Sequence, residues 1–182
     1  RLSEAIRDGD HIRGIIRGSA VNQDGKSNGL TAPNGPAQQD VIQKALYQAS
    51  IEANEIDYIE THGTGTALGD PIEVGAIAAV FGSDKSRENP LLLGSVKTNI
   101  GHTEAAAGIA SLIKVILSME NEMIPQSLHF EKLNPNIVPL ETIPAVVTSQ
   151  NFNWKKSKNR KRIAGISSFG FSGTNAHLII EE

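Results

Sequence analysis

Short apolar segments typical of β-strands alternate along this chain with segments of helical periodicity, and this alternation limits the folds open to it. Residues 11–21, 56–60 and 91–96 carry the side chains of strands, and residues 162–182 indicate a strand, a glycine-rich turn and a strand. Such alternation is typical of layered α/β folds. The 182 residues, 39 % of them hydrophobic, suffice for one domain, so we predict a single α/β unit over 1–182.

The segments between the strands carry helix signals. Pro36 opens a helix with apolar side chains at helical spacing, after a loop at 22–35 that is rich in turn formers. Its apolar positions are Ala37, Val41, Ile42, Ala45, Leu46 and Ala49. Before a second helix, Asp70, Pro71 and Glu73 match a capping box, with Asp70 as the N-cap and Pro71 in the first helical position.

Two helices are apolar on nearly every side, and we expect both to be buried. One covers 73–81, and the other covers 103–119, where Lys114 is the only charge between Glu104 and Glu120. Prolines interrupt residues 124–144, which predicts an irregular connection.

Charge and composition exclude several classes of function. A net charge of −3 gives no general attraction to nucleic acid or to an anionic membrane. No apolar run approaches the ~20 residues of a membrane span, and residues 1–10 lack the apolar stretch of a secretory signal, so we expect a cytoplasmic protein. The chain has no cysteine, which excludes disulfides, thiolate metal sites and a thiol nucleophile within it.

Candidate functional residues follow the apolar strands. His62 and Lys97 each come directly after a strand, His102 precedes a helix, and the turn 169–174 joins the last two strands. Ligands of α/β sheets usually bind at such strand ends, so these segments are expected to converge on one site. The other three histidines lack this setting, and we interpret them as structural or surface residues: His11, His129 and His177.

Other motifs are rejected or stay open. Residues 20–27 resemble a phosphate-binding loop, but Ala20 replaces its first glycine and no helix signal follows. His62 and His102 have no nearby third ligand, which argues against a metal, and no GxGxxG follows the first strand. The basic run 154–162 is either a solvated loop or a docking surface for an acidic protein.

Four motifs together resemble one known family. THGTGTALGDPIE (61–73), GSVKTNIGHTEAAAGIA (94–110) and SSFGFSGTNAH (167–177) are similar, in this order, to the C-terminal half of a β-ketoacyl synthase (ketosynthase) domain. The loop VNQDGKSNGLTAPNGPAQQ (21–39) resembles that of type I polyketide synthases more than that of animal fatty acid synthases. The resemblance implies a thiolase-like fold, in which this chain is the C-terminal half of a layered αβαβα domain, with a mixed sheet and a buried helix.

The family implies a Cys–His–His site for decarboxylative Claisen condensation in polyketide or fatty acid biosynthesis. The cysteine belongs to the N-terminal half, so this chain alone is expected to be an inactive fragment of an acyltransferase. By resemblance, His62 and His102 donate hydrogen bonds to the enolate oxygen. Lys97 supports their network and favours neutral His102. The Phe171 backbone N–H completes an oxyanion hole while its ring gates the acyl pocket.

The remaining implied roles concern substrate and support. Thr64 and Thr66 match residues that hydrogen-bond the phosphopantetheine arm of the carrier protein, and no cofactor is bound directly. Glu73 is expected from its position to pair with Lys97. The implied partners are acyl carrier protein, the N-terminal half, a neighbouring acyltransferase domain and a second copy in a homodimer, but neither nucleic acid nor membrane. The alternative function is a non-condensing ketosynthase-like module that only binds acyl chains or carrier protein.

Overall fold

The computed structural model describes residues 1–182 except 27–28, 30–31, 83–86, 88, 138–139 and 141–143. Parts of the expected loop 22–35 and of the expected connection 124–144 therefore lie outside the described residues. The helices are α1 (Leu2–Asp8), α2 (Gly35–Ala49), α3 (Gly69–Phe81), α4 (Lys97–Ile100) and α5 (Ala107–Glu120), with 3-10 turns η1 (Ala53–Glu55) and η2 (Glu104–Ala106). The strands are β1 (Ile15–Gln23), β2 (Tyr58–Glu60), β3 (Leu91–Gly94), β4 (Met123–Ile124), β5 (Ala145–Val147), β6 (Phe152–Asn153), β7 (Ile163–Phe169) and β8 (Thr174–Glu181).

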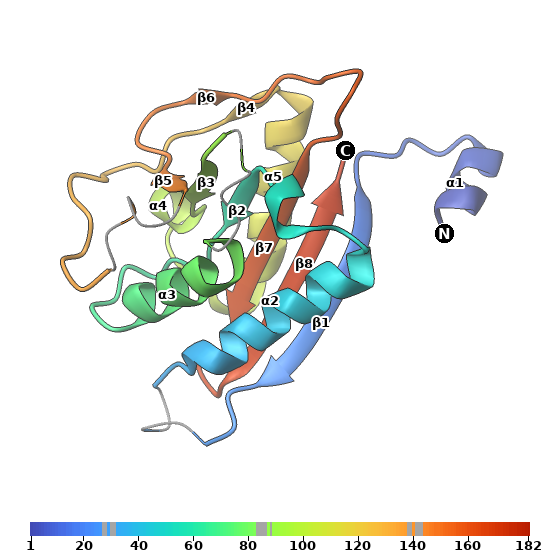
Figure 1. Ribbon diagram of the computed structural model, residues 1–182. Coiled ribbons are helices and arrows are strands. Elements are labelled where there is room, and N and C mark those ends of the chain that lie inside the picture. The colour runs from blue at the N-terminus through green and yellow to red at the C-terminus, as the bar shows by residue number, and fades with distance from the viewer. Residues whose placement is uncertain (27–28, 30–31, 83–86, 88, 138–139, 141–143) are drawn as a thin grey trace.

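Six strands form one mixed sheet in the order β1-β8-β7-β2-β3-β5 (Figure 1). β2 runs parallel to both β7 and β3, and β3 runs parallel to β5. β8 is antiparallel to its two neighbours, β1 and β7. The strands at the centre of the sheet thus share one direction, so their carboxyl ends meet at one edge.

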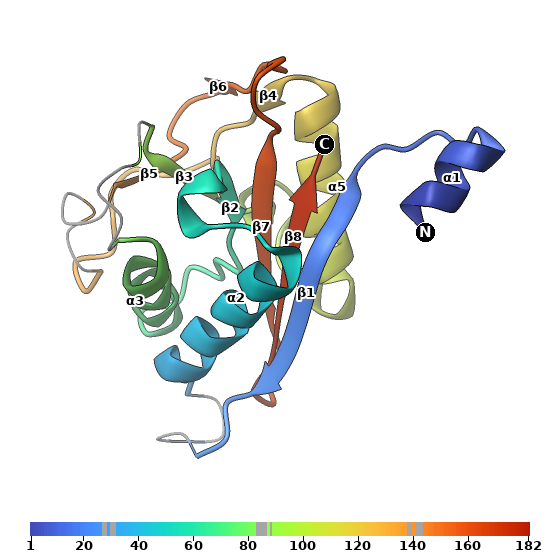
Figure 2. The same ribbon diagram turned by 45° about the vertical axis from the view of Figure 1, so that its right-hand side comes forward.

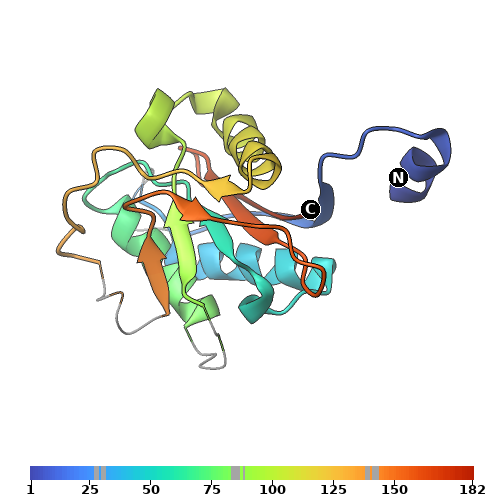
Figure 3. The same cartoon turned by 90° about the horizontal axis from the view of Figure 1, so that it is seen from above.

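Helices cover both faces of this sheet. Figure 3, which looks down on the molecule, shows α2 and α3 on one face and α5 on the other. The first face holds a core around Val41, Ile42 and Ile77, each at most 1 % exposed. The second holds Val115 and Met119 of α5 against the sheet. This arrangement of helices around a sheet confirms the α/β class.

The strand and helix predictions are largely confirmed, with shifts at the ends. The first strand covers Ile15–Gln23 instead of 11–21. α2 begins at Gly35, one residue before Pro36, because the Asn34 side chain accepts a hydrogen bond from the Ala37 N–H and caps the helix.

The predicted capping box of α3 is wrong. The helix starts at Gly69 with Leu68 at the N-cap position, and no side chain of that residue caps it. Asp70 instead accepts a hydrogen bond from the Gly65 N–H, and the Thr66 hydroxyl accepts one from the Gly69 N–H, both at 3.0 Å. The carboxylates that the pattern assigned to the helix therefore hold the preceding loop.

The expectation that α5 is interior on all sides is wrong for this chain. Its sheet-facing side is buried, but Ile109, Ile113 and Leu117 are 54 %, 51 % and 49 % exposed. These residues are spaced four apart and form one apolar stripe on the side away from the sheet. Figure 2 shows that no described helix covers that side.

α1 stands apart from the layers in all three ribbon views and contains no buried residue (Figures 1–3). Within the described part of the chain, none of the helices has the length and apolar character needed to cross a membrane.

Candidate active site

Three loops meet at the carboxyl edge of the parallel strands. His62 follows β2, Lys97 follows β3, and Phe171 follows β7. A cavity of about 590 Å³ opens there. It is lined by Asp24, Pro33, Gln38, His62, Thr64, Thr66, Leu68, Gly69, Glu73, His102, Phe169, Gly170, Phe171 and Asn175. The segments that the sequence predicted to converge do so.

The His62 loop is fixed by Glu73 of α3. The two carboxylate oxygens accept hydrogen bonds from the backbone N–H groups of His62 (2.7 Å) and Gly63 (2.9 Å). Gly63 has a φ of +47°, and a Cβ there would lie 2.6 Å from the Thr61 hydroxyl oxygen. A tight glycine turn and a buried carboxylate therefore set the direction in which the His62 ring points.

A second glycine sets the direction of His102. Gly101 ends α4 with φ 77° and ψ −176°, a conformation that is essentially restricted to glycine. The chain reverses there, and the Glu104 N–H then donates to Nδ1 of His102 at 3.1 Å. Glu104 itself has a φ of +48°, which is unusual for a residue with a side chain.

The two imidazoles meet edge to face, with their ring centroids 5.4 Å apart and their planes at 84°. Nδ1 of His62 accepts a hydrogen bond from the Phe169 N–H of β7 at 3.3 Å, just as Nδ1 of His102 accepts one from Glu104. An Nδ1 that accepts carries no proton, so each neutral ring has its proton on Nε2. Two Nε2–H donors are thus available beside one cavity.

Electrostatics keep His62 neutral. Burial, the Lys97 charge and the neighbouring His102 lower the pKa of His62 to about 4. The effect of Lys97 on His102 stays a prediction, and in the structure the Lys97 charge acts on His62. Burial also lowers the pKa of Lys97, although the charges of Glu60 and Glu73 raise it. Lys97 is half-buried and does not line the cavity.

The predicted ion pair between Lys97 and Glu73 is not formed within the described residues, where Glu73 bonds the backbone instead. Burial raises the pKa of Glu73 to about 7, while the hydrogen bonds from Gly63 and His62 oppose that rise. Glu73 is 4 % exposed, so its carboxyl group belongs to the packed wall of the cavity.

The other predicted residues lie at the mouth of the cavity. The hydroxyl oxygens of Thr64 and Thr66 are 3.5 Å apart and border it. Phe171 is 79 % exposed on the turn between β7 and β8, so its ring is not packed into the core of this chain.

Sequence reasoning missed two features near this site. Gln38 lines the cavity, is 2 % exposed, and its amide oxygen has no hydrogen-bond partner among the described residues. Tyr58, Glu60 and Lys114 form a buried cluster between β2 and α5. A signal for one member existed, because Lys114 is the only charge between Glu104 and Glu120 in an apolar helix.

The remaining histidines fit the interpretation given to them. His177 is fully buried, hydrogen-bonds Ser167, and has its pKa lowered to about 3 by burial. His11 and His129 are exposed. Among the described residues, no group of three or more His, Cys, Asp or Glu side chains could hold a metal ion.

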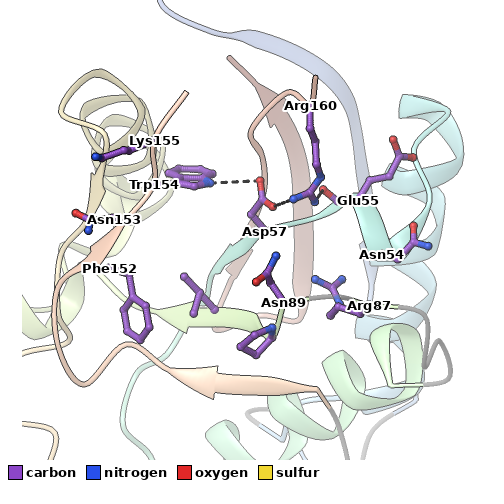
Figure 4. Close-up of a pocket in the computed structure, with 12 residues that line it drawn as sticks. Asn54, Glu55, Asp57, Arg87, Asn89, Phe152, Asn153, Trp154, Lys155 and Arg160 are labelled. Atoms are coloured by element: carbon purple, nitrogen blue, oxygen red, sulfur yellow. Dashed lines mark hydrogen bonds and ion pairs between the residues drawn. The ribbon is translucent and has the colours of Figure 1, made fainter. Parts of the chain in front are cut away.

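A second cavity, of about 650 Å³, lies at the amino ends of the same strands (Figure 4). Trp154 and Arg160 of the basic run 154–162 line it, and both contact Asp57. Trp154 and Arg162, the two ends of the run, are 7 % exposed and anchor it, whereas residues 155–161 are exposed as in a solvated loop. Its exposed cations are Lys155, Lys156, Lys158, Arg160 and Lys161.

Comparisons with known proteins agree with this geometry. Residues 13–131 match the family model of the beta-ketoacyl synthase C-terminal domain. The chain is 52 % identical to the erythronolide synthase EryA3 of Saccharopolyspora erythraea, covering 100 % of this chain and 6 % of that protein. It is also 52 % identical to the spectinabilin polyketide synthase system protein NorB of Streptomyces orinoci, over 100 % of this chain and 8 % of that one.

Among solved structures, the ketosynthase from module 6 of the bacillaene synthase of Bacillus subtilis 168 is similar with a TM-score of 0.95 and 44 % identity. The match covers 100 % of this chain and 33 % of that one, so the chain spans about a third of a solved ketosynthase. A ketosynthase domain of oxazolomycin synthesis from Streptomyces albus gives a TM-score of 0.93 at 38 % identity, again over 100 % of this chain and 33 % of that one. The fold is therefore that of the C-terminal part of thiolase-like ketosynthase domains.

Proposed function

Because this chain belongs to the β-ketoacyl synthase family through its C-terminal domain, we propose that it forms half of a ketosynthase active site. The complete enzyme condenses a cysteine-bound acyl group with a malonyl-type extender carried on acyl carrier protein. The observation that carries this proposal is the pair of imidazoles, 5.4 Å apart, with both Nδ1 atoms occupied by backbone N–H donors.

The chemistry follows from where negative charge develops. When the extender loses CO₂, the electron pair of the broken C–C bond moves onto the thioester carbonyl, whose oxygen becomes an enolate oxygen. The resulting carbanion equivalent attacks the acyl–cysteine carbonyl, and the thiolate leaves. Two preorganised Nε2–H donors stabilise the enolate oxygen as its charge forms, and neither ring has to give up its proton.

Neutrality of the rings matters for this role. An imidazolium donates to an anion more strongly, but it also releases its proton and quenches the carbanion equivalent. The lowered pKa of His62, to about 4, keeps that ring neutral near pH 7. We assign Lys97 to maintaining this state and Glu73 to holding the loop that carries the ring.

The substrate-binding roles are assigned to the mouth of the cavity. We propose that Thr64 and Thr66 hydrogen-bond the phosphopantetheine arm, because their hydroxyl groups border the entrance. The Phe171 ring is exposed beside the cavity, which suits a gate to the acyl pocket, and its N–H is proposed to serve the oxyanion hole together with that of the cysteine.

The partner proposals rest on what residues 1–182 leave uncovered. The apolar stripe of Ile109, Ile113 and Leu117 on α5 suits packing against the N-terminal half of the same domain. Carrier protein delivers the substrates, and a neighbouring acyltransferase domain and a second copy in a homodimer complete the proposed assembly. The isolated chain, which has no cysteine, is expected to show no condensing activity.

The decisive experiment uses the complete ketosynthase that carries this chain. His62→Ala and His102→Ala are each expected to lower the rate of malonyl-thioester decarboxylation by about 10²–10³, as does loss of one oxyanion-hole donor. Transfer of the acyl group to the cysteine should persist. His129→Ala, at an exposed histidine, is the matched control. A wild-type protein that binds acyl thioesters without decarboxylating the extender would instead indicate a non-condensing module.

A further inference from the structure

A buried cluster joins β2, which precedes His62, to α5, which follows His102, and it makes no described hydrogen bond to either imidazole. Lys114 of α5 donates to Glu60 Oε2 (2.8 Å) and to the Tyr58 hydroxyl (2.9 Å), and that hydroxyl also bonds Glu60. Glu60 and Tyr58 are 0 % exposed and Lys114 is 8 % exposed. Opposite charges are thus paired inside the core, where the low dielectric makes their separation costly.

Glu60 connects the three segments that carry the site. It is the last residue of β2, two positions before His62. Its other oxygen, Oε1, accepts a hydrogen bond from the backbone N–H of Val96, the residue that precedes Lys97. Through Lys114, the same carboxylate holds α5, the helix that follows His102.

No other described contact joins these three segments through a single side chain. The Val96 N–H sits at the start of α4, so the Glu60 carboxylate fixes where that helix begins and where Lys97 lies. Gly101 in turn caps the end of α4, and His102 is the next residue along the chain. A shift of the carboxylate would therefore move His62, Lys97 and His102 relative to one another.

We propose that Glu60, with Lys114 and Tyr58, is a positioning residue that sets the separation of the two imidazoles. This inference rests on the proposed ketosynthase function, because it concerns the step in which both rings donate hydrogen bonds to the enolate oxygen. An error of about 1 Å in such an arrangement costs up to ~10² in rate. Acyl transfer to the cysteine, which does not need both rings at one oxygen, is less affected.

The test compares four variants in the complete ketosynthase. Glu60→Gln keeps an acceptor for the Val96 N–H but loses the charge, and Lys114→Met removes the link to α5. Each is expected to lower kcat for decarboxylation roughly ten- to a hundredfold, with an unchanged KM for the extender. Tyr58→Phe keeps the ion pair and should lower kcat severalfold.

The double variant Glu60→Gln/Lys114→Met separates positioning from folding. With no unpaired charge left in the core, its thermal stability should recover compared with either single variant, while its kcat stays low. The control is Arg162→Met, which breaks another buried ion pair, with Glu182, at the far end of the sheet. It should lower thermal stability and leave kcat of the folded enzyme unchanged.

Several results would contradict the positioning role of Glu60. If decarboxylation by the Glu60 and Lys114 variants stays within twofold of wild type, or if kcat of the double variant recovers with its stability, the proposal is wrong. If those variants fail to fold and Tyr58→Phe has wild-type kcat, the proposal is equally overturned. If the wild-type enzyme does not decarboxylate the extender, the proposed function and this inference are both wrong. If His62→Ala and His102→Ala lose decarboxylation but the Glu60 and Lys114 variants keep it, only this inference is wrong.

Discussion

The parallel strands β2, β3 and β7 have a cavity at each end, and the two cavities differ in how their polar groups are paired. At the amino end, about 650 Å³ in volume, Asp57 binds the Trp154 indole N–H (3.3 Å), the Ile163 N–H (3.1 Å) and Arg160 (2.6 Å). At the carboxyl end, about 590 Å³, Nε2 of both His62 and His102 has no partner among the described residues.

The contrast teaches that the volume of a cavity says little about its chemistry. Buried polar groups are normally satisfied, and an unsatisfied one calls for an explanation. In the amino-end cavity, both carboxylate oxygens of Asp57 have partners within the wall. In the carboxyl-end cavity, the buried Gln38 amide oxygen has no hydrogen-bond partner among the described residues, which is the condition expected of a wall that binds a substrate.

Gly101→Ala tests the contrast with the largest expected effect. A Cβ is strained at φ 77° and ψ −176°, so the chain before His102 should relax and move that ring, lowering decarboxylation by about 10². Gly9→Ala is the control, because Gly9 has a similar φ of 74° on α1, far from the cavity. Steady-state rates should separate the two variants, and equal losses would contradict the role of Gly101.

A matched pair of substitutions compares the two cavities directly. Glu73→Gln and Asp57→Asn each replace one carboxylate oxygen, which accepts from a backbone N–H, by an amide NH₂ group. Each substitution should lower the free energy of unfolding by about 1–3 kcal/mol. Only Glu73→Gln should also lower decarboxylation by the folded enzyme, about tenfold, because it loosens the His62 loop. Chemical denaturation and kinetics on the same samples provide the measurement; a comparable kinetic loss in Asp57→Asn would remove the distinction.

Lys97→Met sharpens the electrostatic side of the comparison. Burial, and after it the Lys97 cation, lower the pKa of His62 to about 4, so removing the cation should raise that pKa towards the ordinary 6.5. The acid limb of the pH profile of decarboxylation then moves to higher pH. Lys44→Met, at an exposed lysine paired with Asp40, should leave the limb in place. A limb that stays fixed or moves down in Lys97→Met would show that the charge acts elsewhere.

The lowered pKa of His62 also makes the free energy of unfolding depend on pH. His62 binds its proton near pH 4 when folded and near 6.5 when unfolded, so the unfolded state holds more protons between these values. Its contribution to the free energy of unfolding is therefore full above pH 6.5 and is lost as the pH falls towards 4. Glu73, raised from 4.5 to about 7, acts in the opposite sense and loses its contribution as the pH rises through 7.

Thr66→Val carries the smallest expected effect. It removes the acceptor for the Gly69 N–H at the start of α3, which should cost about 1 kcal/mol in the free energy of unfolding. If the hydroxyl also binds the phosphopantetheine arm, KM for the carrier-bound substrate rises severalfold. Thr66→Ser keeps the oxygen and should restore both values, whereas a KM that stays at the wild-type value in Thr66→Val would argue against a binding role.

The sequence predicted most of this fold because its signals are local. Residues 56–60 and 91–96 contain the strands, and the glycines and prolines mark their ends. Convergence at the carboxyl edge followed from the strands being parallel. The start of α3 was missed because its acidic side chains bond the loop before it, and local spacing cannot tell these two uses apart.

Other contacts that sequence reasoning missed are long-range. Glu60 and Lys114 are 54 positions apart, with no pattern that links them, and their pairing depends on how α5 packs on the sheet. The exposed stripe of α5 was missed for a related reason. An apolar helix looks the same in sequence whether both of its sides are covered by this chain or only one.

The strand order has a consequence for how the protein is made. β1 pairs with β8, Ile15 opposite Glu181, and Phe169 of β7 supplies the N–H that orients His62. During synthesis, the first strand and the His62 loop therefore leave the ribosome long before the segments that complete them. The nascent chain must keep Ile16 and Val21, which are 57 % and 68 % exposed even in the finished sheet, from pairing with other strands until residues 163–181 arrive.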